Sequence, residues 1–425
     1  MNLELLKKLL AEASPAAWEI VDEKIRGWEF YFIRHKLDQA RSKEVENLLL
    51  KLYMAPESKE TIGMASCLIL PTESEVEVRQ KIEDLKKRAL LVQNPYYTLR
   101  SDDGIPKEDL KMVAVDAISD TFIRTMTDLE ETETEDINSY EIFANEVHRH
   151  VLNSEGVDIT EIYPDSMLEV VVNARSDDGH EIEIYRNLTS GTANPEAIKK
   201  EIAKAMTFGR DKLRAVKTPS LGQYPVILST SAVTSVFNYF FSQVDASMKY
   251  RGLSAAELGK PLTEGVAGDK VTMLAVRKLP NSSRNFGTDS EGAIIRERML
   301  IRDNVPESFH GTRQYSEYLG LGESSIVYNY AVKPGNKPAC ELRQGAYIEV
   351  VEFSDFQVDS MTGDIAGEIR LGYLHDGENV TIVSGSSVSG NLREAMKHMT
   401  FSREAVQYDT CLVPEVVRFE SLTIS

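Results

Sequence analysis

The chain has 425 residues, of which 67 are acidic and 48 basic, with a formal net charge of −19 at pH 7. This length is enough for two or three domains, and the acidic balance argues against binding to nucleic acid or to anionic membranes. The three cysteines (Cys67, Cys340 and Cys411) are too few and too scattered for a disulfide framework or a zinc ribbon. No stretch approaches the roughly twenty apolar residues of a membrane span. We therefore expect a cytoplasmic protein.

Residues 1–100 predict an N-terminal α/β domain. The apolar spacing from Leu3 to Ala13 is typical of an amphipathic helix. Two β-rich runs, Leu48 to Met54 and Ile62 to Leu70, flank a polar turn and predict a hairpin. Thr72 and Glu75 form a capping box, which predicts a helix reaching about Val92.

Residues 101–216 predict a strand-rich central segment with flanking helices. Pro106 fits the first turn of a helix ending near Leu129. From Ser139 to Asn187 nearly every run is typical of a strand, and Asp178-Gly179 marks a hairpin turn. A second helix follows Asn194-Pro195.

Residues 217–425 predict a β-rich C-terminal domain with one buried core helix. A short strand from Tyr224 to Ser229 precedes apolar residues at three-and-four spacing from Val233 to Met248. A further helix is expected from Leu392 to His398. Four further strands are expected at Tyr347 to Phe353, Ile365 to Tyr373, Val380 to Val383 and Val416 to Ile424. The predicted fold class is therefore α+β: an N-terminal α/β part followed by a mainly β domain.

Seven short motifs occur in order along the chain. They are Asn153-Ser154-Glu155-Gly156, Tyr224-Pro225-Val226, Gly252 to Lys260, Asp289-Ser290-Glu291-Gly292, Thr362-Gly363-Asp364, Gly390-Asn391-Leu392 and Leu422-Thr423-Ile424. In this order they resemble the TldD/PmbA (TldD/TldE) protease family, also labelled modulator of DNA gyrase. The resemblance implies the α+β fold described above and dimeric packing around a chamber in which unfolded peptides are cleaved.

The family's metal motif is altered in this chain. In the TldD-type subunit the core helix carries His-Glu-x-x-x-His, whereas the corresponding positions here are Asn238, Tyr239 and Gln243. Cys411 resembles in its place the family's third metal ligand, although a small buried thiol is the simpler interpretation. Asparagine and glutamine are poor zinc ligands, and tyrosine is a weak general base at neutral pH. We therefore expect no catalytic residue and no metal in this chain, with zinc only in a TldD-type partner.

Two other groups of residues are candidates. His148 and His150 could form a metal pair on one strand face, but the absence of a third ligand nearby favours a plain polar face. His310, Arg313 and Tyr315 gather in a glycine-containing loop, and such loops often carry binding residues. We consider these three as substrate-channel candidates, the alternative being a surface loop that packs on the domain or on a partner.

The resemblance thus predicts a metal-free, PmbA/TldE-like subunit of a TldD/TldE-type metalloprotease, which acts on unfolded or leader peptides. Its partner would be a TldD-type subunit or a second copy of itself. One alternative is a non-enzymatic homodimeric binding protein of the same fold. Another is a cysteine hydrolase that uses Cys411 with a histidine such as His310.

Overall fold

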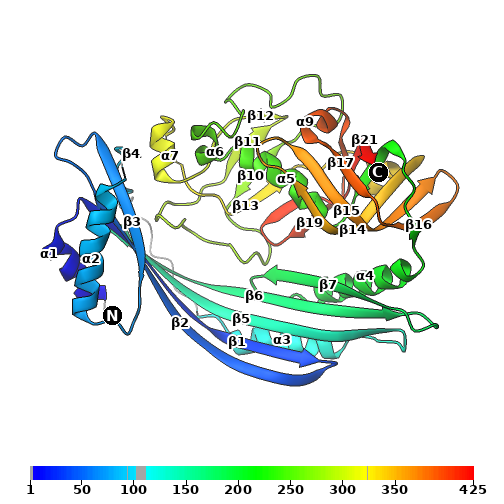
Figure 1. Cartoon of the computed structure of the whole chain (residues 1–425), viewed down its shortest axis with the longest axis horizontal. Helices are drawn as coiled ribbons and strands as arrows, with labels where there is room; N and C mark the ends of the chain where they lie inside the picture. The colour runs from blue at the N-terminus through cyan, green and yellow to red at the C-terminus, as the bar shows by residue number, and fades with distance from the viewer. Residues whose placement is uncertain (1–2, 93, 102–111, 323) are drawn as a thin grey trace.

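Seven strands of the N-terminal half form one antiparallel sheet in the order β4-β3-β2-β1-β5-β6-β7 (Figure 1). The structure, a computed structural model, describes residues 3–92, 94–101, 112–322 and 324–425. The strands are β1 (Ala17–Ile33), β2 (Lys36–Met54), β3 (Thr61–Ile69), β4 (Asn94–Pro95), β5 (Glu135–Asn153), β6 (Asp158–Arg175) and β7 (Glu181–Ser190). The sheet takes strands from both segments 1–100 and 101–216, so these segments share one structural unit.

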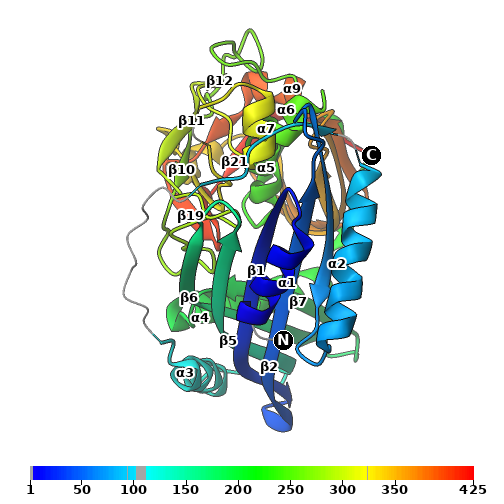
Figure 2. The ribbon, with the colours of Figure 1, turned by 90° about the vertical axis from the view of Figure 1, so that its left-hand side faces the viewer.

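Two pairs of helices cover this sheet. The pair α1 (Leu3–Ala13) and α2 (Glu75–Leu90) packs on β1, β2 and β3, and the pair α3 (Val115–Thr127) and α4 (Pro195–Leu213) packs on β5, β6 and β7. In Figure 2, α2 and α3 lie on opposite sides of the long strands, because the sheet twists strongly along its length. The C-terminal half lies above the sheet in both views.

The predicted helices of the N-terminal half are confirmed, with two differences at their starts. The capping box of α2 uses Ser74 and Glu77: the Ser74 hydroxyl accepts from the Glu77 amide at 3.4 Å, and the Ser74 amide donates to the Glu77 carboxylate at 2.8 Å. The prediction that Thr72 and Glu75 form this box was therefore wrong. The helix that ends at Thr127 begins at Val115, and its predicted start at Pro106 lies outside the described residues.

The C-terminal half contains two further sheets. In the eight-stranded one, the neighbours β14-β9-β21-β17-β15 close into a ring because β15 also pairs with β14. Its strands are β8 (Val216–Lys217), β9 (Gly222–Leu228), β14 (Ala346–Val358), β15 (Asp364–Asp376), β16 (Val380–Ser384), β17 (Ser387–Asn391), β18 (Thr400–Phe401) and β21 (Val417–Ile424). The six-stranded sheet consists of β10 (Met273–Val276), β11 (Arg298–Arg302), β12 (Val305–Pro306), β13 (Asn329–Val332), β19 (Ala405–Tyr408) and β20 (Cys411–Pro414). The α+β fold class is thus confirmed.

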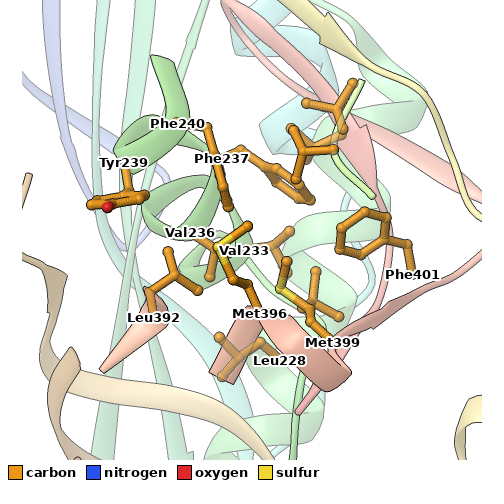
Figure 3. Close-up of a cluster of buried hydrophobic side chains, with 14 of the residues drawn as sticks. Leu228, Val233, Val236, Phe237, Tyr239, Phe240, Leu392, Met396, Met399 and Phe401 are labelled. Atoms are coloured by element: carbon orange, nitrogen blue, oxygen red, sulfur yellow. The ribbon is translucent and has the colours of Figure 1, made fainter. Parts of the chain in front are cut away.

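Helix α5 (Ala232–Gln243) lies in the core between these two sheets. Val233, Val236, Phe237 and Phe240 are 0% exposed and pack with residues from both sheets. Figure 3 shows these side chains beside Met396, Met399 and Phe401. The predicted helix from Val233 to Met248 is in fact two helices, because the Asp245 side chain caps a new one, α6 (Ala246–Tyr250), through the Ser247 and Met248 amides.

The remaining helices are short: α7 (Arg313–Tyr318), α8 (Ala339–Leu342), α9 (Leu392–Ala395) and the 3₁₀ turn η1 (Met396–His398). None of the helices in the described part of the chain is long and apolar enough to cross a membrane.

Candidate functional site

One flank of α5 carries Asn238, which contacts Tyr330 of strand β13. The Tyr330 hydroxyl donates a hydrogen bond to Asn238 Oδ1 at 2.7 Å. Strands β13 and β20 run parallel, and their register places Cys411 opposite Tyr330. The Cys411 thiol is itself 3.3 Å from the Tyr408 carbonyl oxygen. The structure therefore brings Asn238 and Cys411 together, with the Tyr330 hydroxyl between them.

These three side chains are neutral at neutral pH. Burial raises the pKa of Cys411 to about 11. Burial, with Cys411 nearby, also raises the pKa of Tyr330 well above its usual value. Zinc in proteins binds thiolate, neutral imidazole and carboxylate groups, whereas this cluster offers an amide, a phenol and a thiol. It does not fit a zinc ion, and none of the described residues form another group of three metal-binding side chains.

Tyr239 and Gln243 point away from this cluster. The Tyr239 hydroxyl accepts a hydrogen bond from Arg393 Nε at 3.0 Å. The Gln243 amide donates to the Ser360 carbonyl at 2.6 Å and accepts from the Ser254 hydroxyl at 3.1 Å. The separation of Gln243 from Asn238 follows from their five-residue spacing, about 140° around an ideal helix. Of the four positions that resemble the metal site, Asn238 and Cys411 therefore lie at one flank of α5, and Tyr239 and Gln243 lie at the other.

The second flank is held by a turn that two of the motifs build together. Asn391 Nδ2 donates to Asp364 Oδ1 at 2.8 Å and to the Thr362 carbonyl at 3.1 Å, and the Leu392 amide donates to the Gly363 carbonyl at 2.6 Å. Arg393 reaches from the same place to Tyr239. The motifs at residues 362–364 and 390–392 therefore support α5.

His310 lies in the core of the C-terminal half, with 4% of its surface exposed. Its ring stacks on the Phe241 ring with a centroid separation of 4.2 Å. The Phe241 ring stacks in turn on the Tyr330 ring, with a centroid separation of 4.9 Å. Burial lowers the pKa of His310 to about 4, although Asp245 opposes the shift. Because Phe241 separates His310 from Tyr330 and Cys411, the structure forms no Cys411–His310 pair for a cysteine hydrolase.

Arg313 and Tyr315 belong to α7 and point in different directions. Arg313 Nη2 donates to Thr98 Oγ1 of the N-terminal half at 3.2 Å, whereas the Tyr315 hydroxyl accepts from Arg251 at 2.7 Å. The structure therefore does not bring His310, Arg313 and Tyr315 together to line one channel. Instead, α7 packs against the N-terminal half, where Tyr318 donates to the Pro95 carbonyl at 2.5 Å.

The two histidines of β5 each contact a carboxylate of their own. His148 lies 2.8 Å from Glu146, and His150 lies 2.7 Å from Asp158. This arrangement is the polar strand face that the sequence favours.

The junction between the long sheet and the C-terminal half is a site that the sequence analysis missed. Glu161 of β6 accepts hydrogen bonds from the Gly287 amide at 2.6 Å and the Thr288 hydroxyl at 2.9 Å. It also pairs with Arg149 of β5, whose side chain is 4% exposed and donates to the Thr288 carbonyl at 2.7 Å. Burial alone would lower the pKa of Arg149, but the neighbouring Glu161 carboxylate raises it, so that the pKa of Arg149 lies above its usual value.

The motif at residues 289–292 completes this junction. Asp289 is fully buried and accepts from the Ala293 amide at 2.9 Å and the Ile326 amide at 2.8 Å. Gly292 has a φ of +84°, and a Cβ there would lie 2.5 Å from Val157, directly after the motif at residues 153–156. Burial, Asp289 and Glu19 raise the pKa of Glu291 to about 7. The sequence marked both motifs, but only the tertiary structure shows that Gly292 of one lies beside Val157, which directly follows the other.

Two surface cavities are present in the described part of the chain. One, of about 300 Å³, is lined by residues of β17, β21, α9 and η1, including Asn391 of the turn beside α5, His398 and Leu422. The other, of about 510 Å³, is lined by residues of α3 and β6, including Ile118 and Ile162. Neither cavity includes Asn238, His310 or Arg313.

Comparisons with known proteins agree with this architecture. Residues 221–425 match the family model of the PmbA/TldA metallopeptidase C-terminal domain. Three solved structures share the fold. A proposed modulator of DNA gyrase from Thermotoga maritima is 17% identical over 100% of both chains, with a TM-score of 0.78. TldE from Thermococcus kodakarensis is 16% identical over 99% of this chain and 100% of its own, with a TM-score of 0.76, and a proposed modulator of DNA gyrase from Bacteroides thetaiotaomicron is 17% identical over 100% of this chain and 98% of its own, with a TM-score of 0.78. None of the curated proteins matches the chain.

Residues 221–425 therefore form a domain of the type found at the C-terminus of PmbA/TldA metallopeptidases. At these identities the likeness to the solved structures concerns the fold alone. The family assignment from sequence therefore extends to residues 221–425, whereas the rest of the chain shares the fold of these solved structures.

Proposed function

We infer that the chain is a metal-free, TldE/PmbA-like subunit of a cytoplasmic TldD/TldE-type metalloprotease that acts on unfolded or leader peptides. The observation that carries this proposal is the cluster around Tyr330, in which the possible zinc ligands, the Asn238 amide and the Cys411 thiol, are both neutral. A catalytic zinc needs three protein ligands and an activated water. In this proposal a TldD-type partner supplies the zinc, and this chain supplies scaffold and chamber wall.

The positions that resemble the metal motif already have other contacts. Gln243 bonds to Ser360, and Tyr239 bonds to Arg393. A ligand at position 243 would have to leave the turn at residues 359–364 to reach Tyr330. This separation supports a structural rather than a catalytic role for the helix in this chain.

The test is to measure zinc by elemental analysis and to follow cleavage of a fluorescein-labelled unfolded casein. Both measurements use the purified chain alone and after mixing with a TldD-type protein from the same source. We expect no zinc and no cleavage by the chain alone, and greater cleavage by the mixture than by the TldD-type protein alone. A Cys411→Ser variant is the matched control, because it removes the only thiol of the cluster and should leave both results unchanged.

Stoichiometric zinc or cleavage activity in the isolated chain would contradict the proposal. A zinc-free chain that adds nothing to the activity of the TldD-type protein would instead favour the non-enzymatic binding protein.

A further inference from the structure

A short segment of the N-terminal half contacts helix α7 of the C-terminal half. This segment, residues 95–100, begins in β4, and we call it the strap. In Figure 1, α7 lies at the end of the C-terminal half that faces β4. The Thr98 amide donates to Glu317 Oε2 at 3.1 Å, and the Thr98 hydroxyl donates to Glu317 Oε1 at 2.5 Å. The Tyr318 hydroxyl donates to the Pro95 carbonyl at 2.5 Å. The strap–α7 contact therefore joins the two halves of the molecule.

Glu291 holds the start of α7. Its carboxylate accepts a hydrogen bond at 2.7 Å from the amide of Arg313, the first residue of the helix. The Thr312 side chain, which precedes the helix, makes no capping hydrogen bond. Arg313 Nη2 donates to the Thr98 hydroxyl at 3.2 Å and pairs with Glu317. Glu291 is thus linked to the strap through α7.

Two buried carboxylates lie near Glu291. Asp289, on the same loop, is fully buried and accepts hydrogen bonds from three backbone amides at 2.8 to 2.9 Å. Glu19 of β1 is 5% exposed, accepts a hydrogen bond from the Tyr53 hydroxyl and lies 3.5 Å from Lys51 Nζ. Hydrogen bonds donated to a carboxylate favour its ionised form. Glu291 therefore has two neighbours whose contacts suit a negative charge.

The charged and titratable groups that act on Glu291 come from five parts of the described structure. They are Asp289 of its own loop, Glu19 of β1, Lys51 of β2, Tyr97 of the strap and Arg313 of α7, while Arg100 of the strap acts on Asp289. Lys51 pairs with Glu19, and Arg313 pairs with Glu317. Burial and the charges of Asp289 and Glu19 raise the pKa of Glu291 to about 7.

We propose that a proton on Glu291 keeps the strap–α7 contact closed and that loss of this proton opens it. A protonated Glu291 still accepts from the Arg313 amide through its carbonyl oxygen. Loss of the proton places a third negative charge beside Asp289 and Glu19, and movement of the loop and α7 away from β1 relieves the repulsion. The chain would then have a pH-dependent opening between its two halves. This proposal is independent of the metal-free function.

The test is hydrogen exchange of the full chain at pH 5 and pH 7, corrected for the intrinsic effect of pH on exchange. Since the pKa of Glu291 is about 7 when the contact is closed and 4.5 in water, the opening equilibrium should increase by up to about tenfold per pH unit between these values. We therefore expect residues 95–100 and 313–318 to lose at least about tenfold in protection from pH 5 to pH 7. A six-residue helix that has lost its contacts is not stable in water, so the amides of α7 report the opening.

Local opening is distinguished from global unfolding by comparison with α4. At both pH values the strap and α7 should exchange faster than α4, and with less dependence on urea, because a local opening exposes little surface. Exchange at the rate of α4 and with the same urea dependence would mean that the contact opens only when the whole chain unfolds, which would overturn the proposal.

Two variants assign the effect to Glu291. Glu291→Gln keeps an oxygen acceptor for the Arg313 amide but cannot ionise, so the loss of protection between pH 5 and pH 7 should disappear. Glu297→Gln is the matched control, because Glu297 is exposed and should leave the loss unchanged. Glu19→Gln removes one of the neighbouring charges and should make the loss smaller. Protection that does not change with pH in the unmodified chain, or a loss that persists in Glu291→Gln, would refute the role given to this proton.

Discussion

Replacing Glu161 by leucine should loosen the junction between the long sheet and the C-terminal domain. The substitution leaves the Arg149 guanidinium, 4% exposed, with the Thr288 carbonyl and the rings of Phe286 at 4.4 Å and Tyr163 at 6.0 Å as neighbours. Removing one partner of a buried ion pair costs about 3 to 5 kcal/mol. Because Glu161 itself is 19% exposed, we take the lower end, about 3 kcal/mol.

The expected change in melting temperature follows from the size of the chain. An unfolding entropy of about 2.1 cal/mol/K per residue amounts to about 0.9 kcal/mol/K for 425 residues. If the halves unfold together, a loss of about 3 kcal/mol lowers the midpoint by about 3 °C. The amides of Gly287 and Thr288, which lose their acceptor, should also exchange hydrogen faster.

Thermal unfolding followed by circular dichroism, together with hydrogen exchange of residues 286–296, measures both effects. Glu307→Leu is the control, because its ion pair with Arg302 is exposed and should contribute less than about 1 kcal/mol. Replacing Arg149 by methionine in the Glu161→Leu variant should restore part of the loss, since no unpaired charge then remains buried. An unchanged midpoint with unchanged exchange in Glu161→Leu would refute the role given to this pair.

Three further predictions concern the core and its ionisable groups. Phe237→Ala should lower the free energy of unfolding by about 3 to 5 kcal/mol in a urea titration, because Phe237 is fully buried. The control Leu258→Ala, at a half-exposed position, should change this free energy by no more than about 0.5 kcal/mol. At pH 8 a maleimide should label exposed Cys340 and spare buried Cys411, because the Cys411 pKa of about 11 leaves little thiolate. Equal labelling of the two cysteines in the folded chain, measured by mass spectrometry, would contradict this prediction. Since the pKa of Glu291 rises from 4.5 to about 7 on folding, the native state binds more protons in this window, and the stability of the chain should fall as pH rises through it. His310 has the opposite sign, because its pKa falls from 6.5 to about 4, so its contribution rises with pH between these values. Melting curves from pH 4 to 8 should therefore lose the downward slope in Glu291→Gln and the upward slope in His310→Gln, and an unchanged pH profile in either variant would refute its assignment.

The regular elements could be predicted because their periodicity is local. The apolar spacing predicts helix α1 with its observed bounds, and the apolar residues of α5 mark it as a core helix. The capping box of α2 was misassigned because Thr72 with Glu75 and Ser74 with Glu77 satisfy the same spacing rule. Only the backbone conformation decides which hydroxyl reaches an amide, and at Ser74 it is extended.

The candidate site was less predictable because its contacts join distant parts of the chain. Tyr330 carried no signal of its own, since its role depends on the parallel pairing of β13 with β20. His310, Arg313 and Tyr315 looked like one group because they are close in sequence. Arg313 and Tyr315 lie on the helix α7, where residues two apart point about 200° apart, while His310 is fixed in the core before the helix begins.

Six of the seven motifs meet in pairs, and under the proposed function this pairing explains how the fold can persist without a metal site. Val157, which directly follows residues 153–156, packs against Gly292 of the motif at 289–292. Residues 362–364 bond to 390–392 beside α5, and β9 pairs with β21 through Tyr224 and Leu422. The first pair uses buried Asp289 and Gly292, the second uses the Asn391 side-chain amide, and the third uses strand pairing. In this chain Asn238, Tyr239 and Gln243 each bond to a different neighbour, so under the proposed function the former ligand positions have become part of the same packing. It follows that histidine at position 238 alone would gain no second ligand from position 243 unless the turn at residues 359–364 released its glutamine.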